Sequence, residues 1–461
     1  MTVNGYQAPP SGPDEIHRDS TTSTDLRTAG RGVTDRLAPN GHHIASNGLA
    51  GSIADATSFQ TAIPRSFRTR AAHAGEESGQ TTRPMVAPIF QSSVYAFSDP
   101  SHVDACRLAD PPQPVYSRDG LPNAVALERA VAELEGAAAA HATASGMAAI
   151  ALVFLSHLSA GDHALVAADG YCDTEALLTQ ELSRFGVDTT VVAVDDHAAL
   201  RDAFTPRTRL LFVETISNPG MRLADLPSLA RIAQRRRALL CVDNTFATPA
   251  LCRPLEHGAD LVVHSATKFL GGHHDLTAGI VAGSTALIEP IRRVGYLFGP
   301  TLGAMDAWLT VRGIKTLAPR MAWISASAAH LTQLLAGHPR VSAVRYAGYD
   351  QAALAHQLLP HGAGGMIALD VAGGAEAAHK VVRALRLIPY APSLGGISTT
   401  VSYPPARPCI TSEPTNSATL RLSIGLEDPI DLFEDLAQAL EALPLPPRVA
   451  EDLTDFDWLT P

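Results

Sequence analysis

Two short stretches, close together in the chain, constrain most strongly what it can fold into. Asp243 ends one apolar run, and Lys268 follows the next apolar run with Ser265 and Thr267 beside it. Short apolar runs of this kind predict strands that are buried on both faces of a parallel sheet. Ligands of open α/β sheets bind at the carboxyl ends of such strands. We therefore expect an acid, an amine and two hydroxyl groups to meet at one edge of a sheet.

These groups favour a site for pyridoxal phosphate (PLP). The amine of Lys268 can form a Schiff base with the aldehyde of PLP, and Asp243 can keep the ring nitrogen protonated so that the ring withdraws electrons. The hydroxyls of Ser265 and Thr267 can bind the phosphate. Taken alone, Lys268 indicates a surface lysine and Asp243 a turn residue or helix cap. Their occurrence together favours the PLP site.

Composition limits the class of protein. Of the 461 residues, 46% are hydrophobic and 18% are charged, which allows a large core and more than one domain. The net charge of -11 argues against nonspecific binding to nucleic acid or to anionic membranes. Five scattered cysteines indicate reduced thiols, and no apolar run reaches the about 18 residues that span a bilayer. We expect a cytoplasmic protein that is not in the membrane, and no metal site.

The pattern of hydrophobic residues predicts an α/β fold with a mainly parallel mixed sheet and a smaller C-terminal α/β domain. Short apolar runs predict strands near residues 163–168, 190–194, 210–213, 239–242, 261–263, 366–370 and 420–423. Helical spacing is found over residues 124–140, 226–237, 324–336, 376–387 and 431–443. The predicted organisation is a disordered tail over 1–60, an arm over 61–120, a large PLP-binding domain over 121–319 and a small domain over 320–461.

Further segments carry candidate ligands. Residues 144–149 are small and open a helix, whose backbone N–H groups can hold a phosphate. Tyr171 follows a predicted strand and can stack on a planar cofactor, although a half-buried core tyrosine would look the same. Asn218 and Glu214 follow another strand and can reach the cofactor ring, or can belong to a turn.

Two arginines are also candidates. Arg118, which follows Tyr116 in a loop rich in Pro and Gly, can grip a phosphate or remain a solvated charge. Arg421 lies in the apolar run 420–423, where an unpaired charge is costly to bury. Its partner is therefore a protein acid or a ligand carboxylate. We expect the carboxylate of an amino-acid substrate.

Residues from about 68 to 445 resemble the Cys/Met-metabolism family of PLP enzymes, which includes methionine γ-lyase, cystathionine γ-lyase, cystathionine γ-synthase and the homoserine sulfhydrylases. The motifs that carry the resemblance are residues 214–219, 242–249, 265–268, 312–317, 393–396 and 421–428. The resemblance implies PLP-dependent transferase fold type I. It also implies a homotetramer made of two catalytic dimers.

The resemblance assigns roles to the candidate residues. Lys268 would carry the cofactor, Asp243 would bind the ring nitrogen, and Tyr171 would stack on the ring and take part in acid–base steps. The other contacts that it implies are phosphate binding by Gly146, Met147, Ser265 and Thr267, completion of that site by Tyr116 and Arg118 of a neighbouring subunit, a cofactor contact from Asn218, and substrate binding by Arg421, Ser393 and Tyr116.

The chain departs from the family pattern around the substrate. Pro392 stands where members that use cystathionine have Glu, so cystathionine is a poorer candidate substrate. Asp173 puts a carboxyl group near Tyr171, where methionine lyases have a thiol. Residues 397–419 are rich in Pro and lack the family's His-Pro and Met-Thr-His elements, which predicts an altered substrate entrance.

The leading hypothesis is γ-elimination from an L-amino acid, with a thiolate, an acyl carboxylate or a halide as the leaving group and Lys268 as the base. The alternative is γ-replacement in trans-sulfuration, in which an O-acylated homoserine reacts with a thiol. The same residues serve both reactions. A third hypothesis, a PLP-binding protein without catalysis, is disfavoured by the intact set of Lys268, Tyr171, Asp243 and Arg421.

Overall fold

The structure is a computed structural model that describes residues 65–76, 84–109, 114–403 and 418–444. The tail predicted over residues 1–60 lies outside the described residues, as do residues 404–417 of the Pro-rich segment. In the predicted arm, helices α1 (Phe67–Ala72) and α2 (Ser101–Leu108) flank residues 84–93, which have no helix or strand. The division into domains stays a prediction.

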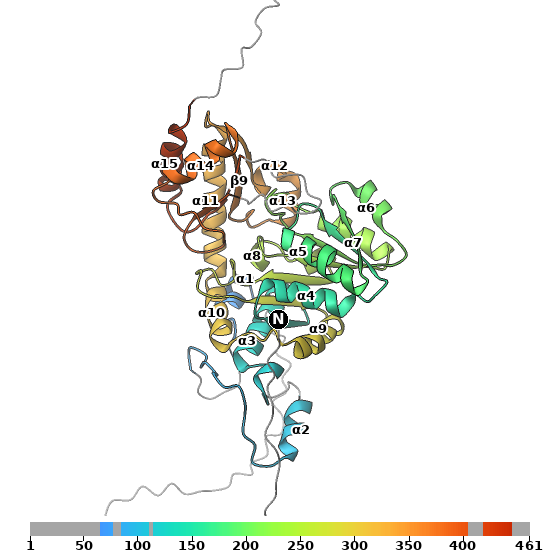
Figure 1. The fold of residues 1–461 in the computed structure, drawn as a ribbon. Coiled ribbons are helices and arrows are strands. Elements are labelled where there is room, and N and C mark those ends of the chain that lie inside the picture. Colours follow the sequence, from blue (N-terminus) through green and yellow to red (C-terminus); the bar gives the residue numbers. More distant parts are fainter. Residues whose placement is uncertain (1–64, 77–83, 110–113, 404–417, 445–461) are drawn as a thin grey trace, which may run out of the picture. The chain divides into compact units, whose positions relative to one another are not determined.

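A mixed sheet of seven strands forms the centre of the fold (Figure 1). In spatial order its strands are β1 (Ala139–Thr143), β7 (Gly279–Gly283), β6 (Leu261–Ser265), β5 (Leu239–Asp243), β4 (Thr208–Glu214), β2 (His163–Ala167) and β3 (Asp188–Val192). The strands from β6 to β3 are parallel, and β7 runs antiparallel to both of its neighbours. The carboxyl ends of β4, β5 and β6 therefore meet at one edge of this sheet.

The inner strands of this sheet are mainly apolar because both faces are covered. On β4, Leu210 and Phe212 pack with Phe154 of α4 (Gly146–His157), and α9 (Thr285–Phe298) lies beside α4 on this face (Figure 1). Leu211 and Val213 alternate with them and pack in the core of the other face. That face is covered by α3 (Pro122–Glu135), α7 (Leu226–Arg235) and α10 (Ala304–Lys315).

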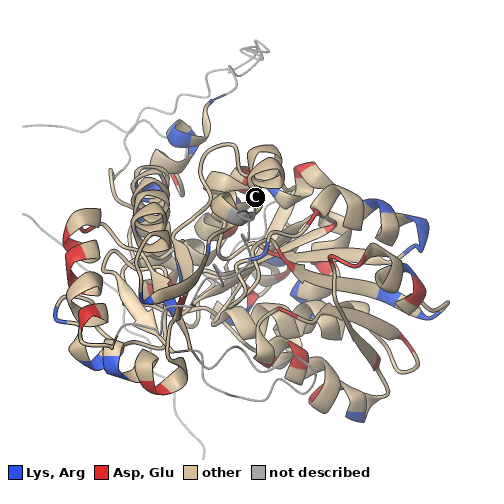
Figure 2. Ribbon diagram, turned by 90° about the horizontal axis from the view of Figure 1, so that it is seen from above, with Lys and Arg blue, Asp and Glu red and all other residues tan. Residues whose placement is uncertain are grey.

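Helix α7 shows how the pattern of residues fixes the orientation of a covering helix. Leu226, Leu229 and Ile232 recur at helical spacing and are buried, whereas Arg231 and Arg235 are exposed. Asp225 caps the helix by accepting a hydrogen bond from the Ser228 N–H at 3.2 Å. Figure 2 shows that many of the Lys and Arg segments lie at the periphery of the fold.

A second sheet is antiparallel and has four strands, in the order β10 (Thr400–Ser402), β11 (Thr419–Ser423), β9 (Met366–Val371) and β8 (Val341–Arg345). Helix α11 (Leu317–Ala336) contacts this sheet and also α10. Helices α14 (Gly374–Ala384) and α15 (Pro429–Glu441) pack beside it. The remaining helical segments are η1 (Ser117–Asp119), α5 (Cys172–Ala176), η2 (Leu177–Glu181), η3 (Leu182–Phe185), α6 (His197–Ala203), α8 (Thr248–Leu251), η4 (Pro254–His257), α12 (Ala347–Asp350) and α13 (Ala352–Leu358).

The predicted α/β class and the mainly parallel sheet are confirmed. One predicted helix, over residues 124–140, is too long. Helix α3 ends at Glu135, because Gly136 adopts the left-handed conformation at its end, and β1 begins at Ala139. Strands β1 and β7 had no counterpart among the predicted strands. In the described part of the chain, no helix is long and apolar enough to cross a membrane.

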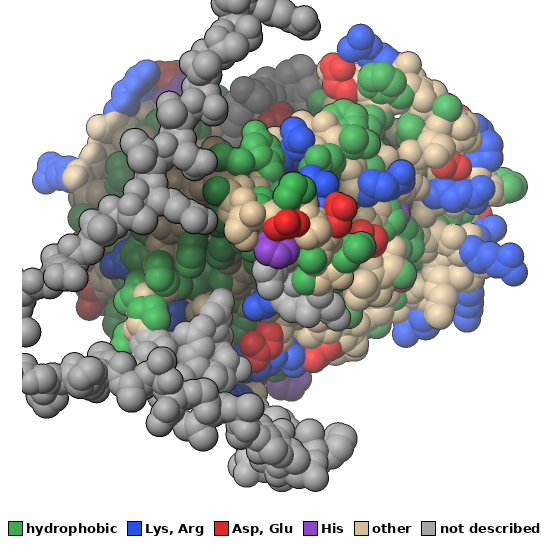
Figure 3. Space-filling view, turned by 90° about the horizontal axis from the view of Figure 1, so that it is seen from below, with side chains coloured by type: hydrophobic (Ala, Val, Ile, Leu, Met, Phe, Trp, Pro, Cys, Tyr) green, Lys and Arg blue, Asp and Glu red, His purple; other side chains and the backbone are tan. Residues whose placement is uncertain are grey.

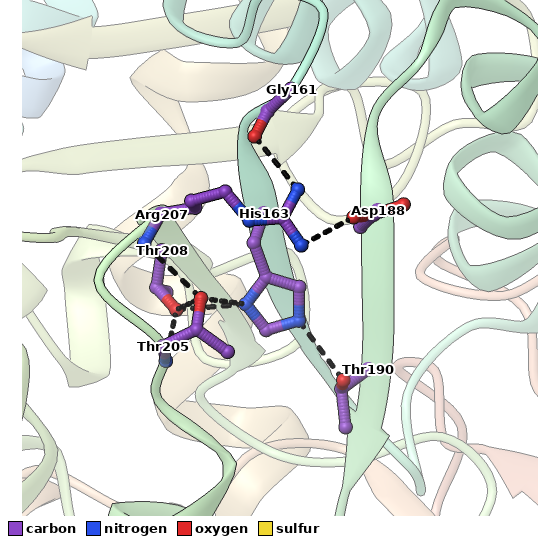
Figure 4. Close-up of polar contacts among 7 residues, drawn as sticks. All are labelled: Gly161, His163, Asp188, Thr190, Thr205, Arg207 and Thr208. Atoms are coloured by element: carbon purple, nitrogen blue, oxygen red, sulfur yellow. Dashed lines mark hydrogen bonds and ion pairs between the residues drawn. The ribbon is translucent and has the colours of Figure 1, made fainter.

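A buried histidine joins three strands at the amino ends of β2, β3 and β4 (Figure 4). The Nδ1 atom of His163 lies 2.7 Å from Thr208 Oγ1, and its Nε2 atom lies 2.9 Å from Thr190 Oγ1. Arg207 and Asp188 close the cluster toward solvent with an ion pair of 2.7 Å. Burial lowers the pKa of His163.

We predict that His163 makes folding stability depend on pH. Below the ordinary histidine pKa of about 6.5, the unfolded chain binds a proton at this position, whereas the folded chain still excludes it. The free energy of unfolding therefore falls as pH falls, by about 1.4 kcal/mol per pH unit at most. The fall ends when the pH reaches the lower pKa of the folded state. Unfolding of wild type and His163→Gln is measured at pH 7.5 and 5. The variant should lose less stability on acidification than wild type. The exposed control His356→Gln should behave as wild type, and equal losses in all three proteins would contradict the prediction.

Candidate active site

The site residues lie where β4, β5 and β6 end. Glu214 and Asp243 are register partners at the ends of β4 and β5, and Ser265 is the last residue of β6. Lys268 follows in a turn in which its N–H donates to the Ser265 carbonyl at 3.0 Å. The same turn is tied to the start of β7 by Thr267, whose N–H and hydroxyl both contact the Ala278 carbonyl.

Lys268 projects from this turn toward the second sheet. Its Nζ donates a hydrogen bond to Ser393 Oγ at 3.1 Å. Burial lowers the pKa of Lys268, and the positive charge of Arg421 lowers it further. The amine therefore loses its proton more readily than a surface lysine, as a nucleophile or a base requires.

Asp243 and Glu214 form a pair of buried carboxyl groups. Burial raises the pKa of Asp243, against hydrogen bonds from Thr245, whose N–H donates to Asp243 Oδ1 at 2.9 Å. Burial raises the pKa of Glu214 well above its ordinary value, and the charge of Asp243 raises it further. Among the described residues, neither carboxyl forms an ion pair with a Lys or Arg. A cationic ligand group such as a protonated ring nitrogen would complement this pair.

The amino end of α4 lies close to Ser265. Ser145 caps the helix, accepting a hydrogen bond from the Ala148 N–H at 3.1 Å. A Cβ at Gly146 would lie 2.7 Å from the Ser265 Cβ, so only glycine allows the helix to approach Ser265 this closely. The N–H groups of a first helical turn have no partner within the helix, and the helix dipole favours an anion there. Gly146, Met147 and Ser265 thus form a donor set that suits the phosphate of PLP.

Tyr171 is held by two carboxyl groups. Its N–H donates to Glu214 Oε1 at 2.6 Å, and its hydroxyl donates to Asp173 Oδ2 at 2.7 Å. The residue is 40% exposed, and its predicted stacking on the cofactor stays a prediction. The carboxyl group that the sequence placed near Tyr171 is in direct contact with the phenol.

Arg421, on β11, reaches across to the large sheet. Its Nη1 donates to Asn218 Oδ1 at 2.8 Å. Burial lowers the pKa of Arg421, while Tyr171 and Glu214 act in the opposite direction. Asn218 thus faces Arg421, and its contact with the cofactor stays a prediction. Within the described residues Arg421 has no ion pair with an acid, which leaves its guanidinium suited to a ligand carboxylate.

Tyr116 and Arg118 contact a different part of the chain. The Arg118 guanidinium lies 4.5 Å from the centre of the Tyr296 ring, on α9, and 5.4 Å from that of Tyr116. In the described part of the chain, no hydrogen bond or ion pair connects them with Lys268. Their predicted contribution to a neighbouring subunit's site stays a prediction.

The chain is similar to known enzymes over most of its length. The family model described as Cys/Met metabolism PLP-dependent enzyme matches residues 68–441. The L-methionine gamma-lyase of Pseudomonas putida is 40% identical over 388 residues, covering 82% of this chain and 97% of that protein. The O-succinylhomoserine sulfhydrylase of Pseudomonas aeruginosa is 39% identical, covering 77% and 90%. The chain therefore belongs to the Cys/Met metabolism family of PLP-dependent enzymes.

A solved structure agrees with this assignment. A putative O-acetylhomoserine (thiol)-lyase of Campylobacter jejuni aligns with a TM-score of 0.76 and 26% identity, covering 82% of this chain and 100% of that one. That protein contains N'-pyridoxyl-lysine-5'-monophosphate. The chain is an enzyme, its fold is that of the family, and its cofactor is PLP.

The sequence analysis missed Arg320, on α11. This buried guanidinium donates from Nη1 to the Phe269 carbonyl at 2.8 Å and from Nη2 to the Gly313 carbonyl at 2.7 Å. Burial lowers its pKa to about 10. Phe269 directly follows Lys268, so Arg320 fixes the turn that carries the amine. Arg320 lies before the helix predicted over residues 324–336, and no local feature of the sequence marked it as buried.

We predict that Arg320→Met destabilises the protein by at least about 2 kcal/mol, because several buried carbonyls lose their donor. Thermal unfolding of the apo protein measures this loss. Retention of PLP on dialysis should also fall, because the turn of Lys268 loses its support. The matched control Arg231→Met removes an exposed arginine and should stay within about 0.5 kcal/mol of wild type. Equal stability of the two variants would contradict the role assigned to Arg320.

Proposed function

We propose that this chain is a γ-lyase, which eliminates a γ-substituent from an L-amino acid and releases an oxoacid and ammonia. The observation that carries the proposal is the partly buried amine of Lys268, which lies beside Ser393 and near Arg421 and has a lowered pKa. An amine in this state can remove a proton from a carbon that the cofactor has made acidic. The similarity to a methionine gamma-lyase over most of the chain supports the proposal.

Arg421 would bind the substrate carboxylate. Its guanidinium is partly buried, fixed by Asn218, and close enough to Lys268 to lower the lysine pKa. A carboxylate held there in a fork would place the α-carbon of the substrate toward Lys268. Ser393 would keep the lysine amine oriented until the substrate arrives.

Lys268 would move the protons, and the surrounding groups would hold the cofactor. Bound PLP supplies an electron sink for the carbon next to the substrate nitrogen. Asp243 would hold the ring nitrogen, while Gly146, Met147 and the hydroxyls of Ser265 and Thr267 would hold the phosphate. Lys268 would take the proton from the α-carbon, return that proton to the bound substrate and cofactor so that its amine is neutral again, and then take one from the β-carbon, which prepares departure of the γ-substituent.

Tyr171 would act on the side of the leaving group. The Tyr171 hydroxyl carries a proton that a departing thiolate can accept. In the structure this hydroxyl donates its hydrogen bond to the carboxyl of Asp173. A carboxylate in this position stabilises the protonated phenol and opposes negative charge on the leaving group. Asp173 is thus proposed to set which leaving groups the enzyme expels.

The second candidate function is γ-replacement, because a sulfhydrylase is almost as similar to the chain as the lyase is. The same Lys268, Arg421 and Tyr171 would serve it. The two reactions differ in whether water or a thiol completes the turnover. Residues 404–417, in the Pro-rich segment expected at the substrate entrance, lie outside the described residues.

We also propose that the enzyme acts in the cytoplasm as a homotetramer of two catalytic dimers, in which Tyr116 and Arg118 complete the phosphate site of a neighbouring subunit. Large hydrophobic side chains that are exposed in this single chain support the assembly. They include Met85, Val86, Leu297 and Phe298, each more than half exposed. Figure 3, which shows the molecule from below, has hydrophobic side chains at the surface on this side.

We predict that Lys268→Ala abolishes oxoacid release from L-methionine, because the base and the attachment point of the cofactor are both lost. Oxoacid and ammonia are measured with the purified PLP-loaded protein, and Lys380→Ala, which removes a half-exposed lysine of α14, should keep wild-type activity. A fully active Lys268→Ala variant would contradict the proposal.

The same assay with O-acetylhomoserine, with and without a thiol, decides between the two functions. A thioether product that forms only with the thiol, and no oxoacid without the thiol, would establish γ-replacement.

We predict that Asp173→Asn raises kcat/KM for L-methionine on the order of tenfold, which corresponds to about 1.4 kcal/mol of transition-state stabilisation. The amide keeps the shape and can still accept the Tyr171 hydrogen bond, but it removes the negative charge near the leaving thiolate. Methanethiol release reports the effect. The exposed control Asp104→Asn should change nothing. If the rate with Asp173→Asn instead falls, Asp173 assists the phenol and the assigned role is wrong.

A further inference from the structure

A buried ion pair lies directly behind the cofactor-binding strand ends. Glu135, the last residue of α3, and His264, on β6, are both 0% exposed, and Glu135 Oε1 lies 2.6 Å from His264 Nε2. The two residues are 129 positions apart in the chain. None of the roles assigned above uses them.

The pair is incompletely bonded. Among the described residues, Glu135 Oε2 and His264 Nδ1 have no hydrogen-bond partner although both atoms are buried. Buried polar atoms are nearly always bonded, and a buried ion pair is seldom more stable than apolar residues of the same volume. Stability alone therefore gives no reason for this pair, and a functional reason must be sought in what it touches.

The pair is connected to the turn that carries Asp243. Asn244 donates from Nδ2 to Glu135 Oε1 at 3.1 Å and to the Cys252 carbonyl at 2.8 Å. Its Oδ1 accepts a hydrogen bond from Thr215 Oγ1 at 2.8 Å. The Thr215 N–H in turn donates to the Asp243 carbonyl at 2.9 Å. Asn244 and Thr215 are both 0% exposed, so these contacts are shielded from water.

The positions in the chain connect this network with the cofactor. Asn244 follows Asp243, and His264 precedes Ser265, so these two network residues are each the neighbour of a proposed cofactor ligand. On the cofactor side, Thr245 joins the same two strand ends, because its Oγ1 accepts a hydrogen bond from the Ser265 N–H at 2.8 Å. The network thus holds from behind the two strand ends that bind ring and phosphate.

We propose that Glu135 and His264 are positioning residues for PLP, which act through Asn244 to fix Asp243 against the ring nitrogen and Ser265 against the phosphate. The inference rests on the assignment of Asp243 as the partner of the ring nitrogen. Burial raises the pKa of Asp243, and His264 acts in the opposite direction and lowers it. His264 therefore favours the charged form of Asp243, as the inference requires. A negatively charged Asp243 is the form that keeps the ring nitrogen protonated.

The test compares variants of the Glu135–His264 pair with a control variant that also removes a buried polar side chain. Glu135→Gln and His264→Gln should weaken PLP binding to the full-length apo protein at least tenfold, measured by titration with PLP. They should also shift the pH dependence of the absorption spectrum of bound PLP. The control is His163→Gln, which removes another buried histidine from the opposite strand ends of the same sheet (Figure 4). It should lower the apo unfolding temperature without altering PLP affinity or spectrum.

The outcomes are distinct. If Glu135→Gln and His264→Gln bind PLP as His163→Gln does, the pair is only structural and the inference is wrong. If Asp243→Asn also leaves affinity and spectrum unchanged, the assignment of Asp243 fails as well. If Asp243→Asn alone weakens binding, only the present inference fails.

A measurement on the wild-type protein covers the case in which the variants do not fold. The ring ¹⁵N signals of His264 should move when PLP is added to the apo protein, whereas those of His163 should stay. Unmoved His264 signals would overturn the inference.

Discussion

The pair of buried carboxyl groups at the ends of β4 and β5 is the constraint on which the rest of the site depends. Burial raises the pKa values of both Glu214 and Asp243, and the charge of one raises the pKa of the other. Two such groups cannot both be charged in a poorly solvated place unless positive charge is brought to them. Arg421 supplies part of it, since it acts to lower the pKa of Glu214. In the proposed site, the protonated ring nitrogen of PLP would supply the complementary charge for Asp243.

The part of the chain that contains the second sheet supplies side chains to the site as the large sheet does. Arg421 comes from β11 and bonds to Asn218, which is 203 residues earlier in the chain, and Ser393 bonds to Lys268 across 125 residues. Arg320 of α11 fixes the turn of Lys268 from the same side. Lys268, the proposed base, is therefore oriented by groups from outside its own sheet.

The sequence predicted those parts of the site that depend on local order. Strand ends are local features, so the placement of Asp243, Ser265 and Lys268 at one edge followed from short apolar runs. The contact of Asp173 with Tyr171 also followed, because the two residues belong to one turn and the helix it opens. Strands β1 and β7 were missed because they consist mainly of Ala and Gly and carry little hydrophobic signal. Glu135 with His264, and Arg320, were missed because nothing in one sequence reveals a contact between residues so far apart.

Two buried histidines of the large sheet show how differently its two ends are built. His163, at the amino ends of the strands, has threonine hydroxyls on both ring nitrogens and an ion pair that closes the cluster. His264, at the carboxyl ends, has one nitrogen on Glu135 and the other without a partner among the described residues. Incomplete bonding in a core is unfavourable, and it tends to persist where a fixed geometry is needed for function. In this sheet it occurs at the edge proposed to bind the cofactor, which is where a small displacement of Asp243 would matter most.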